Sequence, residues 1–368
     1  MAIEKLHIDR FLELGKNYPV LDVRSPGEYN HAHIPGAYNL PLFTDEERKL
    51  VGTAYKQQSR EMAIKIGLDY FGPKMRPMIE YVESLFSSQS GDQGSRQVLI
   101  HCWRGGMRSA GVAWLLDLYG YKVCTLVGGY KTYRHWIIET FSFPFSFNIL
   151  GGYTGSGKTY LLDELANKEA VIINLEKLAC HKGSAFGNIG MPKQPTQEMF
   201  ENLLGHELRT LIENKLVSVP GNGEEPSYNR GSVWLEDESQ RIGQVNIPHD
   251  LWTNMMQSPI LFIDIPFEER LKHIVQEYGN LDKEKVADAI VRIQKRLGGM
   301  ETKTALQNLA AGDIASCFRI LLNYYDKLYR KALNKRDQSR TLLTTLDCTR
   351  VDAQLNAEKI ITNELVIK

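Results

Sequence analysis

The strongest constraint on the fold is the segment GGYTGSGKT (151–159), which follows the apolar run FNIL and precedes the helix-like run YLLDELAN. Its last eight residues match G-x-x-x-x-G-K-[ST], a loop between a strand and a helix whose backbone N–H groups surround a phosphate. In such loops the lysine reaches a terminal phosphate and the following hydroxyl is a position for Mg²⁺. The predicted phosphate-binding residues are Gly152, Gly155, Ser156, Gly157, Lys158 and Thr159. The motif recognises a diphosphate and does not identify the rest of the ligand.

A second chemical centre is predicted at HCWRGGMRS (101–109), between the apolar run VLIHC and a helix-like run that begins at Arg108. Backbone N–H groups and the positive end of a helix stabilise a thiolate there and lower its pKa. Arg104 and Arg108 add positive charge that can hold an anionic substrate. We therefore predict that Cys102 is a catalytic nucleophile, with Arg104 and Arg108 as its partners. A merely structural cysteine at a strand end fits these arginines and glycines poorly.

Strand and helix signals alternate along the chain, which predicts α/β domains with parallel sheets. The expected strands are 18–23, 98–102, 123–129, 147–150, 170–174, 232–236, 259–265 and 341–348. The expected helical regions are 44–86, 108–119, 267–337 and 351–365. An aromatic, proline-containing stretch at 135–146 marks a boundary, so we predict domains at 1–138 and 139–368, the second with a helical C-terminal part.

Acidic and basic residues balance at 44 each, so the net charge gives no overall attraction to nucleic acid. Any RNA contact must come from a local patch, and the segment 324–340 is the candidate because lysines and arginines alternate there with tyrosines. The candidate RNA-binding residues are Lys327, Arg330, Lys331, Lys335 and Arg336. The alternative is an ordinary solvated helix face.

Two further segments carry candidate site residues. Possible metal-holding or catalytic carboxylates follow two of the expected strands, at Glu236, Asp237, Glu238 and Asp264. The alternatives are a solvated charge cluster and a strand-end turn, and no metal-ligand set is assigned. The stretch 174–187 is a candidate lid or substrate loop, or an ordinary surface loop, around His181, Lys182 and Ser184.

The cysteines indicate a reducing compartment. All five are scattered without a CxxC pair, so neither a disulfide framework nor a zinc ribbon is supported. We expect Cys124, in an apolar strand, to be part of the core, and Cys180, Cys317 and Cys348 carry no signal comparable to that of Cys102. The N-terminus lacks the apolar core of a signal peptide, and no apolar run approaches the roughly 20 residues needed to span a bilayer. We expect a cytoplasmic protein without membrane contact.

The N-terminal half resembles the rhodanese domain family. The resemblance rests on two segments on either side of the Cys102 loop, LDVRSPGEYNHAHIPGAYNLP (21–41) and LVGGYKTYR (126–134). The resemblance implies a cysteine that carries a transferable sulfur. We then expect Asp22 and Arg24 to act in structure near the loop, with direct catalysis as the alternative. One departure is the separation of Cys102 from Arg108 by five residues, which resembles the phosphate-binding loop of cysteine phosphatases. A phosphatase therefore stays an alternative for this domain.

The order CWRGGMRS, GGYTGSGKT, LEKLACHKGSAFG and EDESQRIG, over nearly all the chain, resembles the tRNA 2-selenouridine synthase family. The resemblance implies exchange of sulfur for selenium in the wobble 2-thiouridine of tRNA, with selenophosphate as donor. It also implies an S-geranyl-2-thiouridine intermediate made from geranyl diphosphate. Cys102 is then the selenium-carrying nucleophile, a perselenide, and the enzyme that produces selenophosphate is a candidate partner.

Two other functional classes stay open from the sequence. One is a rhodanese-type sulfurtransferase or cysteine phosphatase regulated by a nucleotide-binding domain, which would act without RNA. The other is a non-catalytic RNA-binding or scaffold protein that retains both folds, which would function without the Cys102 thiol.

Overall fold

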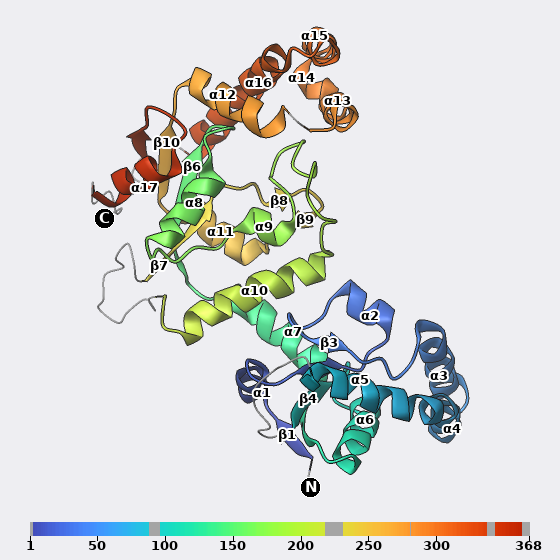
Figure 1. The fold of residues 1–368 in the computed structure, drawn as a ribbon. Coiled ribbons are helices and arrows are strands. Elements are labelled where there is room, and N and C mark those ends of the chain that lie inside the picture. Colours follow the sequence, from blue (N-terminus) through green and yellow to red (C-terminus); the bar gives the residue numbers. More distant parts are fainter. Residues whose placement is uncertain (1–2, 88–95, 218–230, 280, 337–342, 363–368) are drawn as a thin grey trace. The chain divides into compact units, whose positions relative to one another are not determined.

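The computed structural model describes residues 3–87, 96–217, 231–279, 281–336 and 343–362. The chain divides into two compact units, Met1–Thr140 and Phe141–Lys368 (Figure 1). The division falls within the aromatic stretch that the sequence marks as a boundary. Each unit contains its own parallel sheet, and the units are described separately below.

The first unit is built on a five-stranded sheet in the order β1-β5-β4-β2-β3, in which every neighbouring pair is parallel. Its strands are β1 (Glu4–Leu6), β2 (Val20–Asp22), β3 (Tyr38–Asn39), β4 (Gln97–His101) and β5 (Lys122–Leu126). The strand β4 is central, so the chain that leaves its carboxyl end, at Cys102, begins in the middle of the sheet edge.

Side chains along β4 alternate between the two faces of the sheet, as the geometry of a strand requires. Val98, Ile100 and Cys102 belong to one buried cluster, which also contains side chains of α4 to α6. His101 instead meets Phe11 and Tyr130 on the opposite face. Both faces are therefore covered, which explains the continuous apolar run of this strand.

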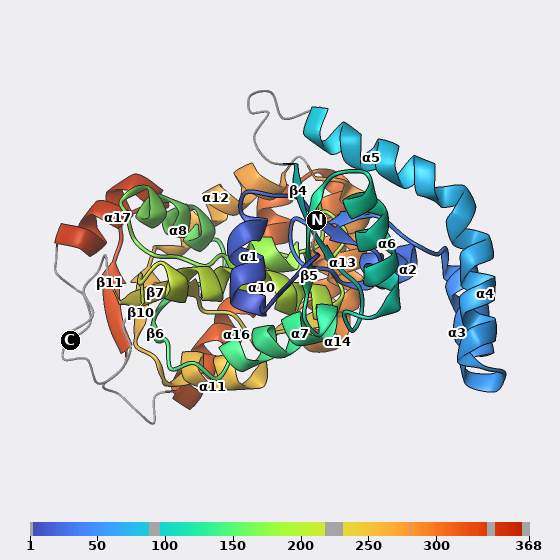
Figure 2. The same cartoon turned by 90° about the horizontal axis from the view of Figure 1, so that it is seen from below.

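Seven α-helices and one 3₁₀ turn are described in this unit. They are α1 (Ile8–Gly15), α2 (Pro26–His31), α3 (Asp45–Gln57), α4 (Arg60–Phe71), η1 (Gly72–Lys74), α5 (Met75–Ser87), α6 (Met107–Leu118) and α7 (Gly129–Thr140). Thr44 and Glu47 form a capping box at the start of α3, and Ser59 caps α4. The two helices lie side by side as a hairpin (Figure 2). The helical prediction for 44–86 is confirmed.

The second unit contains a parallel four-stranded sheet in the order β11-β10-β6-β7 and a short antiparallel hairpin. Its strands are β6 (Ser146–Gly152), β7 (Ser232–Glu236), β8 (Arg241–Ile242), β9 (Val245–Asn246), β10 (Ile260–Asp264) and β11 (Leu343–Asp347). The glycine-rich loop leaves β6, which lies between β7 and β10. The carboxyl ends of two further strands therefore lie beside it.

The predicted strand at 170–174 is wrong. This segment meets β7 only through an isolated bridge between Ile172 and Trp234. The Asn174 side chain then accepts a hydrogen bond from the backbone of Lys177, which starts a helix before a second pair can form.

Ten helices are described in the second unit. They are α8 (Lys158–Asn167), α9 (Leu175–Ala179), α10 (Gln197–Glu213), α11 (His249–Gln257), α12 (Phe267–Tyr278), α13 (Lys283–Arg292), α14 (Gln294–Leu297), α15 (Gly299–Ala311), α16 (Ile314–Arg336) and α17 (Ala353–Thr362). Side chains of α8 and α17 pack on the sheet in one core. Side chains of α12 to α16 form a separate helical core, and Figure 1 shows these helices at one end of this unit.

The observed architecture confirms the predicted fold class of two α/β parts, the second with a helical C-terminal region. None of the described helices combines the length and apolar character needed to cross a membrane.

A buried ion pair joins the helical core to the sheet. The Arg270 guanidinium on α12 donates two hydrogen bonds to the Asp326 carboxylate on α16, at 3.0 and 2.8 Å. It also donates to the carbonyl oxygens of Ile265, after β10, and of Thr154, in the glycine-rich loop. One side chain therefore connects a strand end, the loop and the longest helix.

We predict that Asp326→Ala lowers the free energy of unfolding by about 3–5 kcal/mol, because it leaves the Arg270 charge buried without its partner. Urea denaturation followed by circular dichroism measures this. The control is Glu268→Ala, since Glu268 and Arg319 form an exposed pair between the same two helices, and there we expect no measurable change. Equal effects of the two substitutions would contradict the role given to Arg270.

Candidate functional site

The glycine-rich loop folds as a phosphate-binding loop between β6 and α8. Gly155 and Gly157 have φ values of 81° and 71°, which L side chains rarely adopt. A Cβ on Gly155 would also lie 2.6 Å from the Ile274 side chain. Glycine is therefore required here, and the motif forms in the strand–loop–helix context that the sequence predicts.

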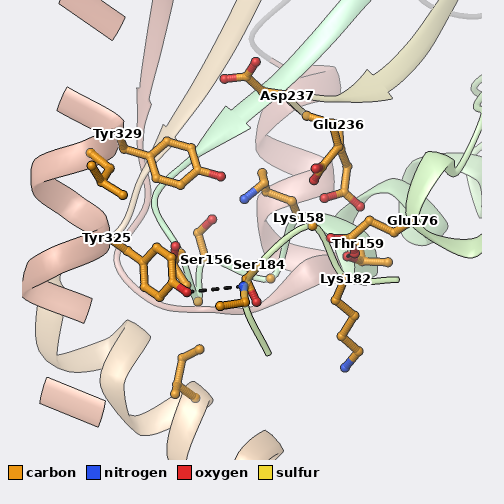
Figure 3. Close-up of a pocket in the computed structure, with 18 of the residues that line it drawn as sticks. Ser156, Lys158, Thr159, Glu176, Lys182, Ser184, Glu236, Asp237, Tyr325 and Tyr329 are labelled. Atoms are coloured by element: carbon orange, nitrogen blue, oxygen red, sulfur yellow. Dashed lines mark hydrogen bonds between the residues drawn. The ribbon is translucent and has the colours of Figure 1, made fainter. Parts of the chain in front are cut away.

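The loop forms one wall of a cavity of about 620 Å³ (Figure 3). The opposite wall comes from the helical core and includes Tyr278, Tyr324, Tyr325 and Tyr329. The remaining sides come from segments after α9 and β7. Five of the six predicted phosphate-binding residues line the cavity: Gly155, Ser156, Gly157, Lys158 and Thr159.

Lys158 is the central cation of this cavity. Its Nζ atom donates to the Gly152 carbonyl oxygen at 3.1 Å and lies 5.6 Å from the centre of the Tyr329 ring. Burial alone would lower the pKa of Lys158, but Tyr329 and nearby carboxylates raise it above its usual value. The side chain is thus a positive charge within the loop that the motif predicts to bind a phosphate.

Three glutamates gather beside Lys158 and Thr159. Carboxylate oxygens of Glu176, Glu236 and Glu238 all lie within 4.8 Å of one another, and the Thr159 hydroxyl donates to Glu176 at 3.2 Å. Burial raises the pKa of Glu176 to about 7, and Glu236 adds to the increase. Burial likewise raises the pKa of Glu236, and it raises that of Glu238 well above the usual value. These oxygen donors can hold a hard divalent cation.

Only some of the other carboxylates and lid residues suggested by the sequence line the cavity. Asp237 lines the cavity, whereas Asp264 is exposed at the end of β10 and is not among the lining residues. Lys182 and Ser184 line the cavity, but His181 is buried outside it. Glu176 is a site residue that was not predicted from the sequence. Its signal is a carboxylate in the first turn of a capped helix that follows the apolar run AVIIN.

The candidate RNA-binding residues lie on α16. Lys327, Arg330 and Lys331 are exposed there, while the side chains of Lys335 and Arg336 lie outside the described residues. The tyrosines that alternate with them have another role, since Tyr324, Tyr325 and Tyr329 face the cavity. They are therefore part of the cavity wall and do not form an exposed surface for stacking on bases.

The Cys102 loop forms a second centre, in the first unit. The Cys102 Sγ atom accepts a hydrogen bond from the Gly106 N–H at 3.4 Å and lies 3.3 Å from the Ser109 hydroxyl. Burial alone would raise the pKa of this thiol. Hydrogen bonds from the side chain and backbone of Ser109, and from the backbone N–H groups of Arg104 and Gly106, lower it below the usual value. The loop thus favours a thiolate.

The two arginines of the loop differ in their surroundings. Arg104 is exposed. Arg108 donates to Glu28 at 2.8 Å, and Arg48 lies 2.9 Å from the same carboxylate oxygen. An anion bound at the loop must therefore compete with Glu28 for Arg108.

A buried pair supports the loop from below. Asp22 and Arg24 are almost fully buried and pair at 2.6 Å. The Arg24 guanidinium also lies 3.7 Å from the centre of the Tyr130 ring, and the Tyr130 N–H donates to the Cys102 carbonyl oxygen. These contacts give Asp22 and Arg24 a structural place beneath the Cys102 loop.

Comparison with known proteins covers both units. A family model described as tRNA 2-selenouridine synthase AAA domain matches residues 145–359, and a rhodanese-like domain model matches residues 8–135. A tRNA 2-selenouridine synthase of Bdellovibrio bacteriovorus is 31% identical, covering 91% of this chain and 94% of the relative. Relatives of the same name from Nitrosomonas europaea and Hydrogenovibrio crunogenus are 32% and 34% identical, over 86% and 87% of this chain and 90% and 91% of the relatives.

We predict that Ser109→Ala raises the pKa of the Cys102 thiol, because the thiolate loses a hydrogen-bond donor. The rate of alkylation by iodoacetamide, measured against pH, should then rise at a higher pH than in the wild type. The Cys102→Ala protein supplies the background from the other cysteines. An unchanged pH profile would show that Ser109 does not stabilise the thiolate.

Proposed function

The chain belongs to the tRNA 2-selenouridine synthase family, and on that basis we propose that it replaces sulfur by selenium in the wobble 2-thiouridine of tRNA. The observation that carries this proposal is that relatives of that name match 86–91% of this chain, over both units. Each unit supplies one chemical centre, which fits a reaction in two steps.

The first proposed step is S-geranylation at the phosphate-binding loop. The sulfur of 2-thiouridine attacks C1 of geranyl diphosphate, so that a C–S bond forms, the C–O bond breaks and the base loses its N3 proton. Diphosphate then leaves with two or more negative charges, which the Lys158 ammonium and the loop N–H groups offset. Mg²⁺ beside Thr159 would supply further positive charge to the leaving group. The buried carboxylates around Thr159 fit such a cation.

The second proposed step uses Cys102 as the nucleophile toward selenophosphate. Attack of the thiolate at phosphorus forms an S–P bond, breaks the P–Se bond and frees hydrogen selenide. Selenium then adds to C2 of the geranylated base and expels geranylthiol, while water returns phosphate and the thiolate. This route conserves electrons, whereas a perselenide on Cys102 with phosphate as product would need a two-electron oxidant. The spacing of Cys102 and Arg108, which resembles a phosphate-binding loop, supports attack at phosphorus.

The tRNA contacts are proposed on α16. Lys327, Arg330 and Lys331 are exposed on the helix that forms the tyrosine wall of the cavity, and Lys335 and Arg336 continue the basic run in the sequence. Their charges would pair with phosphates of the tRNA backbone. A tRNA substrate places the reaction in the cytoplasm, with the enzyme that makes selenophosphate as a partner.

We predict that Lys158→Ala weakens geranyl diphosphate binding by about 10- to 100-fold, since it removes a charged hydrogen-bond donor worth about 1.5–3 kcal/mol. Isothermal titration calorimetry measures the affinity. Lys168→Ala is the control, because Lys168 lies at the other end of α8, beside Glu164. Unchanged geranylation in Lys158→Ala, together with loss of ATP binding, would reject this assignment of the loop.

We predict that Cys102→Ala stops the formation of 2-selenouridine and lets S-geranyl-2-thiouridine accumulate, because only the second step needs the thiol. Mass analysis of nucleosides after incubation of 2-thiouridine tRNA with both donors measures the two products. Cys124→Ala controls for loss of a buried thiol. An unmodified RNA with every combination of donors would reject the proposed function in favour of a sulfurtransferase or phosphatase.

A further inference from the structure

Three buried glutamates from separate segments meet beside the phosphate-binding loop. Glu176 lies on α9, Glu236 ends β7 and Glu238 follows it, and their side chains line the same cavity. Their exposures are 9%, 2% and 8%. Figure 3 shows Glu176 and Glu236 near Thr159, on the side of the cavity opposite the tyrosines.

The charges of this cluster are not balanced by the protein. Three carboxylates face one ammonium, that of Lys158, because the nearby Lys182 is paired with Glu277. When all three are ionised, the net charge of the group is two negative units in a space with little water. Burial and mutual repulsion make this charge unfavourable unless a cation offsets it. A divalent cation would bring the net charge of the group to zero.

One oxygen of the cluster also has no hydrogen-bond partner. Glu236 Oε1 is buried and accepts no hydrogen bond from the residues that the structure describes. Buried acceptors in folded proteins are almost always satisfied. A buried carboxylate oxygen that accepts no hydrogen bond and faces two other carboxylates can bind a cation. It cannot be satisfied by another hydrogen-bond acceptor.

We propose that Glu176, Glu236 and Glu238, with the Thr159 hydroxyl, form a site for one divalent cation, Mg²⁺ or Mn²⁺, that is filled before the phosphorylated ligand binds. The ligands are all oxygen atoms, which these cations prefer. Ligand oxygens around Mg²⁺ stand about 2.9 Å apart when adjacent and about 4 Å apart when opposite, so carboxylate oxygens that now lie within 4.8 Å of one another must move inward to bind it.

This site deepens the proposed diphosphate site and rests on it for the role of the cation. Phosphate-binding loops usually hold Mg²⁺ with a hydroxyl, one carboxylate and the phosphates themselves. Here three carboxylates can hold the cation without any phosphate, so the cation should bind measurably when no ligand is present. The cation would then order the cavity and attract the diphosphate.

The test is titration of the full-length protein with Mn²⁺ alone, followed by the electron paramagnetic resonance signal of free Mn²⁺. We expect about one bound Mn²⁺ per chain, displaced by Mg²⁺, and binding weakened by about tenfold or more in Glu176→Gln and Glu238→Gln. Asp264→Asn is the matched control, since Asp264 also ends a strand of this sheet, β10, but is not among the residues that line the cavity. Its affinity should equal that of the wild type.

Thermal unfolding separates loss of the site from loss of the fold. In EDTA, Glu238→Gln should unfold at the same temperature as the wild type or a higher one, because it removes a repulsive charge. Mn²⁺ should raise the unfolding temperature of the wild type and not of this variant. Absence of saturable Mn²⁺ binding in the wild type, or equal binding in Glu238→Gln, would overturn the inference.

The two proposals fail in different ways. Mn²⁺ binding that depends on Glu238, in a protein that does not bind geranyl diphosphate, would keep the cation site and reject the proposed ligand. Geranyl diphosphate binding that depends on Lys158 but is unchanged in Glu176→Gln and Glu238→Gln, without Mn²⁺ binding, would keep the ligand and reject the cation site.

Discussion

The second unit depends on the placement of one buried guanidinium. Arg270 donates to a strand-end carbonyl, to the Thr154 carbonyl in the phosphate-binding loop and to Asp326 on α16. Its guanidinium also lies 4.8 Å from the centre of the Tyr153 ring. Because these contacts share one rigid planar group, the helical core cannot move from the loop without leaving a buried charge unpaired. The cavity between the loop and the tyrosine wall exists because of this connection.

In the first unit, too, a buried arginine holds a loop in place. Arg24 is paired with Asp22 beneath the sheet edge and packs on Tyr130, whose N–H in turn holds the Cys102 carbonyl oxygen. The thiol is thereby fixed where backbone N–H groups converge. In both units a buried cation positions a loop, and the loop in turn presents backbone N–H groups to an anion. This shared principle suits a protein whose proposed substrates all carry phosphate.

Short-range patterns were sufficient to predict the two loops, the parallel sheets and the helical C-terminal region, because each depends on consecutive residues. The structure forms a cradle with Lys158 and a thiolate-stabilising loop around Cys102 at the predicted positions. Which residues from distant segments meet at the site could not be predicted from such short-range patterns. Glu176 joins Glu236 and Glu238 only because α9 packs beside the end of β7, and Asp264, an equally plausible carboxylate, lies outside the cavity. The tyrosines of α16 look like an exposed basic and aromatic face in sequence, yet the helix turns them toward Lys158.

The central claim is that the two loops perform separate steps, geranylation at Lys158 and selenium exchange at Cys102. The most direct test supplies tRNA that already contains S-geranyl-2-thiouridine, together with selenophosphate and no geranyl diphosphate. We expect Lys158→Ala to form 2-selenouridine at the rate of the wild type, and Cys102→Ala to form none. Failure of Lys158→Ala on this pre-geranylated tRNA would contradict the account, because the phosphate-binding loop would then act in the exchange step itself.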